Sequence, residues 1–332
     1  MNRAGMLALV QNEVIKIWKK KRFLAIVLIL IAIIPMFTYA QMKTAQEYEK
    51  QFGSRDWRLV TQQQINDITN RMASNRVPEE WKDYMRVQMQ VLQYYLDHDV
   101  DPNAPNGMAF TKSFMANAIN LFIPLMVMVI ASDLVSSEHS SGTIKLLLSR
   151  PVRRWKVLAS KYIALLLYIS LIVVAAALLS YLISGAVFGY GGWQHPVFTG
   201  FKLTGTEVDL SYVHPVPQWF YVFMELGLVW FAAVVTGFMT LMVSVLVRST
   251  AAGMGIMLAV LISGNILTNM VSAWKSAKYL FMVNLLLTDY LAGRLPPIEG
   301  MSLTFSLTVL TVWAAASVAV SFLVFTKKDV LN

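Results

Sequence analysis

The residues with the greatest capacity for chemistry lie in one segment, which begins at Glu138, ends at Lys161 and reads EHSSGTIKLLLSRPVRRWKVLASK. Ser141 or a neighbouring residue can cap a short helix, and Pro151 would end it. That helix would present an apolar knob made of Ile144, Leu146, Leu147 and Leu148. The segment also carries guanidinium groups that can pair with the acidic groups of a partner or with anionic lipid head groups, on Arg150, Arg153 and Arg154. These residue types predict docking rather than catalysis.

No stretch of the chain has a spacing that predicts catalysis or cofactor binding. The sequence contains no G-x-x-x-x-G-K-[ST], H-E-x-x-H or G-x-S-x-G pattern, so we expect no ATPase, no enzyme activity and no catalytic residue in this chain. The acidic group Asp97, His98, Asp99 and Asp101 lacks the Gly and the distal Glu of a calcium loop, and we expect no metal site. The absence of cysteine excludes disulfides and thiolate ligands.

The composition is that of a membrane protein. Of 332 residues, 56% are hydrophobic and only 14% are charged, and the mean hydropathy is +0.54. Soluble domains are about 25% charged. A net charge of +9 would suggest nucleic acid as the partner of a soluble protein. Here the basic residues flank apolar runs, so we expect membrane lipids and no nucleic acid as partners.

Six apolar runs meet or approach the length of about 20 residues that a membrane-spanning helix needs. They predict an all-α polytopic membrane protein with spans at 23–40, 113–135, 162–188, 219–247, 251–271 and 303–325. Pro35 and Pro124 lie inside two of these spans and predict local kinks. Four basic clusters fall on one side if the spans alternate. The positive-inside rule then places both termini, the 138–161 segment and the 326–332 tail in the cytoplasm. We expect the membrane to be a cell membrane, namely the plasma membrane of a bacterium.

The N-terminal residues 1–22 have a helical apolar period. Met6, Val10, Val14, Ile17 and Trp18 alternate with the polar residues Asn12, Glu13, Lys16 and Lys20. This pattern is typical of a helix that lies in the membrane interface. A cleaved secretory signal ending at Ala40 is the alternative, but its basic region would need no such face.

Three segments are expected outside the membrane on the other side. The largest, 41–112, predicts a small helical insertion: Pro78 opens a helix whose apolar stripe is Trp81, Met85, Met89, Leu92 and Tyr95. The stripe would either pack on a neighbouring surface or form a substrate-gating lid. Residues 189–218 form a loop rich in Gly and Pro. In 272–300 the apolar run 279–287 is too short to cross, and predicts a re-entrant or interfacial helix that ends before Gly293 and the Pro296–Pro297 pair.

Polar residues inside the spans are candidate functional residues because their burial in lipid is costly. They are Asn117, Asn120, Glu225, Asn265 and Asn269. Hydrogen bonding between helices is the simpler interpretation for the asparagines. Glu225 lies near the outer end of its span, where it would reach the head groups.

The 138–161 segment resembles the signature of ABC-2-type transporter permeases. The matching residues are Glu138, the Ser141-Gly142-Thr143 turn, the apolar Leu146-Leu147-Leu148 stretch, the Arg150-Pro151-Val152-Arg153-Arg154 element and Lys161. The six-span topology matches over the whole chain. The resemblance implies a cytoplasmic coupling helix, a separate ATP-binding subunit that holds the ATP and Mg²⁺, and a second permease subunit, identical or homologous. It also implies export of a hydrophobic or amphiphilic substrate, and the long first external segment is similar to members concerned with drug or antimicrobial-peptide efflux and envelope stress.

Two other classes of function remain open at this stage. A membrane sensor or scaffold could use the same spans and docking segment without transport. An ion-coupled secondary transporter would require charged residues near the midplane and inverted repeats, neither of which the sequence shows clearly.

Overall fold

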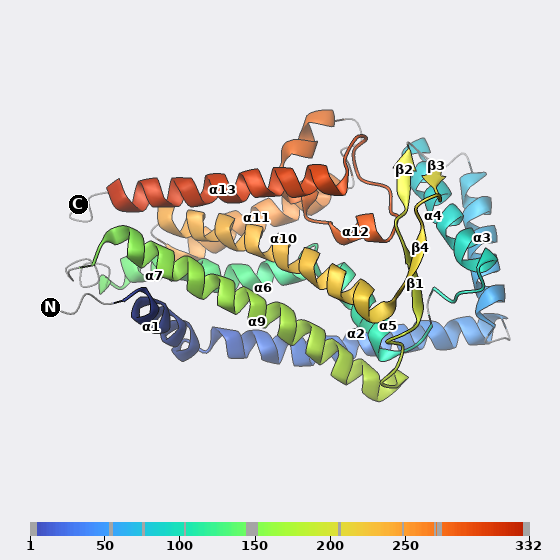
Figure 1. The fold of residues 1–332 in the computed structure, drawn as a ribbon, viewed down its shortest axis with the longest axis horizontal. Helices are drawn as coiled ribbons and strands as arrows, with labels where there is room; N and C mark the ends of the chain where they lie inside the picture. Colours follow the sequence, from blue (N-terminus) through green and yellow to red (C-terminus); the bar gives the residue numbers. More distant parts are fainter. Residues whose placement is uncertain are drawn as a thin grey trace.

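The computed structural model describes residues 5–52, 56–74, 77–102, 104–143, 152–204, 207–247, 249–268, 270 and 274–327. The protein is an all-α polytopic membrane protein, as predicted, and the described residues contain six candidate membrane-spanning stretches. They run side by side along the long axis (Figure 1): α2 (Arg22–Phe52), α6 (Phe122–Ala131) with α7 (Asp133–Ser140), α9 (Arg154–Phe188), α10 (Gln218–Leu246), α11 (Thr250–Thr268) and α13 (Leu303–Lys327).

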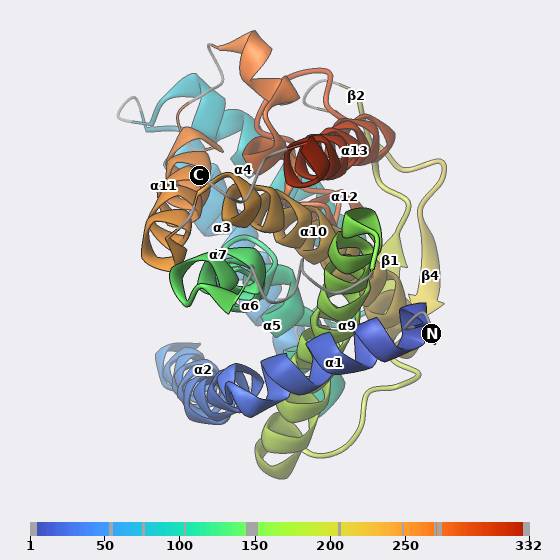
Figure 2. The same ribbon diagram turned by 90° about the vertical axis from the view of Figure 1, so that its left-hand side faces the viewer.

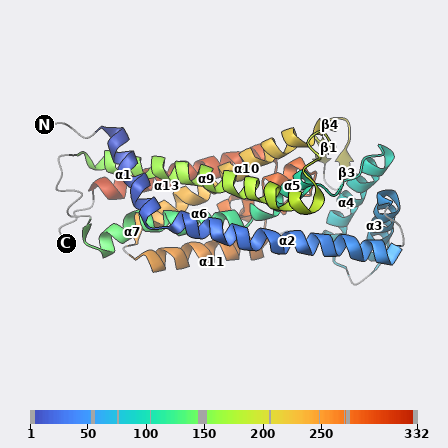
Figure 3. The ribbon, with the colours of Figure 1, turned by 90° about the horizontal axis from the view of Figure 1, so that it is seen from below.

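The two ends of the bundle differ. The short helix α1 (Met6–Lys19) lies at one end, where α13 ends, and we call this the α1 end. At the opposite end, the cap end, lie α3 (Trp57–Met72) and α4 (Glu79–Asp97) (Figure 3). The same end holds two small antiparallel pairs, β1 (Pro196–Thr199) with β4 (His214–Pro217) and β2 (Lys202–Thr204) with β3 (Glu207–Asp209).

The helix α10 lies in the middle of the bundle and packs on α5 (Gly107–Ala118), α6, α9, α11 and α13 (Figure 2). Its buried face is rich in small residues, which let neighbouring backbones approach closely. Gly237 shows the constraint most directly, because a Cβ there would lie 2.8 Å from the Ile169 Cδ1 atom and 3.0 Å from the Val127 Cγ1 atom. A larger residue there would therefore force the Ile169 and Val127 side chains to shift where α10 meets α6 and α9.

The second predicted span is interrupted. Instead of one helix over 113–135, the chain forms α5, a turn at Asn120–Leu121, α6, and then α7 after Ser132. Pro124 is the third residue of α6, a first-turn position where its missing N–H costs no helical hydrogen bond. The proline thus follows a break in the span. By contrast, α2 continues through Pro35.

The first span is longer than its apolar run. The helix α2 has 31 residues and reaches Phe52, twelve residues beyond the predicted end at Ala40. At 1.5 Å per residue it measures about 46 Å, more than the ~30 Å of the hydrocarbon core. Helix-forming polar residues without Gly or Pro continue it past the apolar run, so its last turns lead directly into the cap.

The cap joins all three segments that were predicted to be external. The Tyr95 hydroxyl accepts a 3.1 Å hydrogen bond from the Phe198 N–H, and the Gln90 side chain accepts one of 2.9 Å from the Val208 N–H. Burial raises the pKa of Tyr95 to about 12, although the Phe198 hydrogen bond opposes that shift. The Thr199 hydroxyl donates to the Leu291 carbonyl at 3.2 Å. The predicted helix after Pro78 is present, but its stripe is only partly buried: Tyr95 is buried, whereas Trp81 is 54% exposed.

The 272–300 region contains several short helical pieces where a single short helix was predicted. They are η1 (Lys275–Tyr279), η2 (Phe281–Asn284) and α12 (Thr288–Leu291). The chain leaves α12 through Gly293, whose φ of +67° lies in the left-handed region that favours glycine. The predicted break at Gly293 is therefore where the helical pieces end.

Candidate functional site

The two residues that bracket the 138–161 segment meet in the folded chain. Glu138 lies in the last turn of α7 and Lys161 in the third turn of α9, and the Lys161 Nζ atom is 2.9 Å from the Glu138 Oε1 atom. Lys161 is completely buried. Its ammonium also donates to the Leu134 carbonyl at 2.8 Å and to the Glu13 Oε2 atom at 2.9 Å. The three N–H donors of this lysine therefore have three acceptors.

Glu13 of α1 is the site residue that the sequence analysis missed. It is 3% exposed, and Lys16 bonds both its Oε1 atom, at 2.7 Å, and the Glu138 Oε1 atom, at 2.8 Å. We had placed Glu13 on the polar face of the N-terminal helix. Its position three residues after Val10 and four before Ile17 instead puts it on the buried stripe. That spacing, with Lys16 one turn later, was the available signal.

Glu13, Lys16, Glu138 and Lys161, which we call the charge quartet, have no net charge. This balance matters because an unpaired charge removed from water costs several kcal/mol. Burial of the Lys16 ammonium lowers its pKa, but the carboxylates of Glu13 and Glu138 outweigh burial and hold the pKa above its usual value of 10.5. The quartet connects α1, α7 and α9 at the α1 end.

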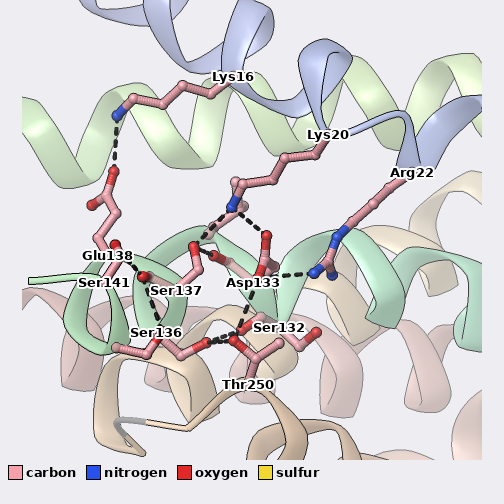
Figure 4. A network of polar contacts seen from close by, with 12 residues as sticks. Lys16, Lys20, Arg22, Ser132, Asp133, Ser136, Ser137, Glu138, Ser141 and Thr250 are labelled. Atoms are coloured by element: carbon pink, nitrogen blue, oxygen red, sulfur yellow. Dashed lines mark hydrogen bonds and ion pairs between the residues drawn. The ribbon is translucent and has the colours of Figure 1, made fainter. Parts of the chain in front are cut away.

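A second charge network on α7 holds the turn between α1 and α2 (Figure 4). Lys21 in this turn has a φ of +55°, which bends the chain sharply. On either side of it, Lys20 pairs with Asp133 and donates to the Ser137 hydroxyl at 2.9 Å, and Arg22 lies 2.9 Å from the Asp133 Oδ1 atom. Three basic residues of the predicted topology cluster, Lys16, Lys20 and Arg22, therefore pair with acids inside the fold.

Hydroxyl groups fasten the other face of α7 to α10 and α11. The Ser244 hydroxyl of α10 accepts from the backbone N–H groups of Val135 and Ser136 and donates to the Ser132 carbonyl at 2.7 Å. The Thr250 hydroxyl, at the start of α11, lies 2.8 Å from that of Ser136. The Ser244 hydrogen bonds therefore satisfy backbone N–H and C=O groups at the α6–α7 junction, where the helix is interrupted.

The remaining residues of the predicted coupling segment are placed unevenly. Gly142 has a φ of +69°, a value that its lack of a Cβ allows, and the Thr143 hydroxyl is 2.9 Å from that of Ser141. Arg153 is the residue before α9, and Arg154 donates to the Thr326 carbonyl at 3.3 Å. Four predicted docking residues lie outside the described residues: Leu146, Leu147, Arg150 and Pro151.

A cavity of 540 Å³ lies between α1 and α7 beside these networks. The three cations Lys16, Lys20 and Arg22 line it together with the carboxylates that they pair with. The opposite wall carries hydroxyl groups, those of Ser137, Ser140, Ser141 and Thr143. Its lining thus includes Glu138, Ser140, Ser141 and Thr143, from the described start of the 138–161 segment.

The intramembrane polar candidates have different surroundings in the fold. The Asn120 side chain donates a 2.8 Å hydrogen bond to the Asn265 Oδ1 atom, which joins the turn after α5 to α11. Asn117 is exposed, and its side chain donates a 2.7 Å hydrogen bond to the Ser113 carbonyl of its own helix. Glu225 is 1% exposed, so the expectation that it reaches the head groups is wrong: α10 directs it into the bundle. Asn269 lies outside the described residues.

Comparison with known proteins covers most of these elements. A family model described as "Protein of unknown function (DUF2705)" matches residues 82–331. The chain belongs to this family. The match includes α7 and the 138–161 segment, while α1 with Glu13 precedes it.

Two relatives come from Bacillus subtilis (strain 168). The chain is 27% identical over 337 residues to "Uncharacterized protein YhcI", an alignment that covers 98% of this chain and 100% of the relative. It is 28% identical over 232 residues to "Uncharacterized membrane protein YdbK", covering 69% of this chain and 85% of the relative. The second name agrees with the assignment of this DUF2705 chain as a multi-pass membrane protein.

Proposed function

We propose that this protein is the membrane-spanning subunit of an ABC transporter of the ABC-2 type. A separate ATP-binding subunit would dock on the 138–161 segment and hold the ATP and Mg²⁺. The cargo would be a hydrophobic or amphiphilic compound such as a drug, an antimicrobial peptide or a lipid-linked molecule. The protein would lie in a bacterial plasma membrane with both termini in the cytoplasm.

The observation that carries this proposal is the buried ion pair between Glu138 and Lys161. These are the two residues that open and close the segment resembling the ABC-2 signature. The pair fixes both ends of the segment to each other, and the charge quartet fixes them to α1. A force applied to the segment would therefore displace α1, α7 and α9 together. A loop needed only for topology would not require such anchoring.

The arrangement of the elements supports the orientation. The end of α7, the start of α9, the end of α10, the start of α11 and the end of α13 lie at the α1 end, and the described parts of the cap lie at the other (Figure 1). The α1 end carries the exposed basic residues Lys19 and Lys21 in addition to the paired ones. By the positive-inside rule this end faces the cytoplasm, where ATP is available.

A polar surface on α5 favours a second permease subunit. Ser113 and Asn117 lie one helical turn apart and are both exposed, within the predicted second span. If α5 lies in the bilayer, as the predicted span 113–135 implies, hydrocarbon tails cannot hydrogen-bond the polar atoms that the Asn117–Ser113 bond leaves over, and another protein surface or a water-filled pathway would cover them. A second copy of this chain would supply either.

The test is purification of the tagged protein from its native membrane in mild detergent. We expect a stoichiometric partner that carries a G-x-x-x-x-G-K-[ST] sequence and hydrolyses ATP. Glu138→Gln should reduce both recovery of the partner and ATP hydrolysis. Glu79→Gln, which removes an exposed carboxylate at the cap end, is the matched control and should change neither.

Two results would refute the transporter proposal. One is the absence of any ATP-hydrolysing partner, and in that case copurification of a signalling kinase alone would favour the sensor or scaffold function. The other is a partner whose binding and ATPase activity do not respond to Glu138→Gln.

A further inference from the structure

The helix α11 buries only a narrow face in the bundle. Of its 19 residues, only four are buried: Gly253, Met257, Leu261 and Gly264. It lies on the outside of the bundle (Figure 3). This narrow apolar face packs on α10 and η2, and polar contacts attach α11 to the α5–α7 region in addition.

The first of these contacts joins the start of α11 to α7. The Thr250 hydroxyl is 2.8 Å from the Ser136 hydroxyl and donates to the Asp133 Oδ1 atom at 3.4 Å (Figure 4). Ser136 already donates its single proton to the Ser132 carbonyl, at 2.6 Å. Thr250 must therefore be the donor toward α7. Valine, which has the same shape without the hydroxyl, cannot replace it in this role.

The second contact lies farther along the same two spans. The Asn120 side chain, at the break between α5 and α6, donates to Asn265 of α11. Asn265 is fifteen residues after Thr250, which corresponds to about 22 Å along the helix axis. The interrupted second span thus holds α11 at two levels, once at the α1 end and once beside its own break.

The helix α7 connects this attachment to the 138–161 segment. It is a single helix of eight residues, with Asp133 and Ser136 in its first turn and Glu138 in its last. A displacement at Glu138 must move Ser136 as well, because one helical turn cannot be compressed without breaking backbone hydrogen bonds. The Thr250 contact would then pass the same displacement to α11.

We propose that Thr250 is a positioning residue through which movement of the 138–161 segment is transmitted to α11. The span that moves in response to the ATP-binding subunit is then α11. Its movement changes the position of Asn265 relative to Asn120 at the break between α5 and α6. This inference rests on the proposed transporter function, since it needs a partner that moves the segment.

The experiment measures the position of α11 in the complex with the ATP-binding subunit, in lipid nanodiscs. The chain has no cysteine, so Ile262→Cys on α11 and Leu171→Cys on α9 can be spin-labelled uniquely; both side chains are exposed on the bundle. Dilution with unlabelled chain isolates the distance within one copy. The probe is Mg²⁺-ATP with vanadate, compared with the nucleotide-free complex.

The wild-type complex should show a nucleotide-dependent shift in the α9–α11 distance. Thr250→Val should abolish most of that shift while the partner remains bound and hydrolyses ATP, and Thr250→Ser, which keeps the hydroxyl, should restore it. Thr268→Val is the matched control, because this hydroxyl of α11 donates to the Gly264 carbonyl of the same helix, and it should leave the shift unchanged.

A Thr250→Val complex that retains the full shift overturns the inference, as does a wild-type complex in which nucleotide leaves the distance unchanged. Loss of the shift in the Thr268 control as well would show a general weakening of α11 and would also overturn it. Failure to find any ATP-binding partner is a different result, which refutes the proposed function itself.

Discussion

Removal of the buried ammonium of Lys161 should destabilise the protein strongly. Lys161→Met keeps a long unbranched side chain in the same space but leaves the charge quartet with two carboxylates and the single cation of Lys16. The Glu13 Oε2 atom and the Leu134 carbonyl both lose the hydrogen bond that the Lys161 ammonium donates to them. Each buried acceptor left unsatisfied costs about 1–3 kcal/mol, and breaking a buried ion pair by removing one partner costs about 3–5 kcal/mol. The expected loss of unfolding free energy is therefore about 3–5 kcal/mol.

A second substitution should recover part of this loss. Glu13→Gln combined with Lys161→Met leaves Lys16 and Glu138 as one neutral pair, 2.8 Å apart. The double variant should be more stable than the sum of the two single losses predicts, by about 2 kcal/mol, because contacting charges are not additive.

Titration of the purified protein with SDS in mixed micelles, followed by tryptophan fluorescence, measures these free energies; the chain has nine tryptophans. Lys19→Met, which removes an exposed lysine of α1, is the control and should cost less than about 0.5 kcal/mol. The reasoning fails if Lys161→Met costs less than about 1 kcal/mol, or if the losses of the double variant simply add.

Three further outcomes are expected. Because Lys16 has a higher pKa in the folded than in the unfolded chain, its ion pairs stabilise the fold fully below pH 10.5 and are lost as the pH rises through the folded value. Lys16→Met should therefore flatten the alkaline decline of thermal stability, and an unchanged decline would contradict this. A double-mutant cycle with Asn120→Leu and Asn265→Leu should give a coupling of about 0.6 kcal/mol, and a value near zero would mean that the bond does not form in a bilayer. In intact cells, a single cysteine introduced at Ser276 should react with an impermeant thiol reagent, and one introduced at Ser140 should not. Labelling at Ser140 would contradict the predicted orientation.

The number of candidate spans could be predicted from sequence because it depends on a local quantity. About 20 apolar residues must be contiguous to cross the hydrocarbon core, and a window over the sequence finds them. Helix ends and interruptions follow other rules. The extension of α2 to Phe52 reflects helix propensity after the apolar run has ended. The break at Asn120–Leu121 occurs inside a single apolar run. In the fold, α5 and α6 are two separate helices, and both pack against the central α10.

The charge quartet could be predicted only in part. Glu138 and Lys161 were singled out by the motif that they bracket, and both belong to the site. Glu13 lies 148 residues from Lys161 in the sequence, so no local pattern joins them. A clue was present in its position on the stripe with Val10 and Ile17, but a carboxylate on an apolar stripe is recognisable as a site only when a buried cation is known to face it.

The same networks change the interpretation of the basic residues before α2. In the sequence, Lys16, Lys20 and Arg22 count only as signals for the orientation of the first span. In the fold they pair with Glu13, Asp133 and Glu138, and together with Lys161 they balance these buried carboxylates. Acidic residues contribute little to the positive-inside rule, so the pairing leaves the predicted orientation unaltered. One set of cations can thus both orient the first span and fasten it to α7, which is why counting charges predicts an orientation but not the attachment.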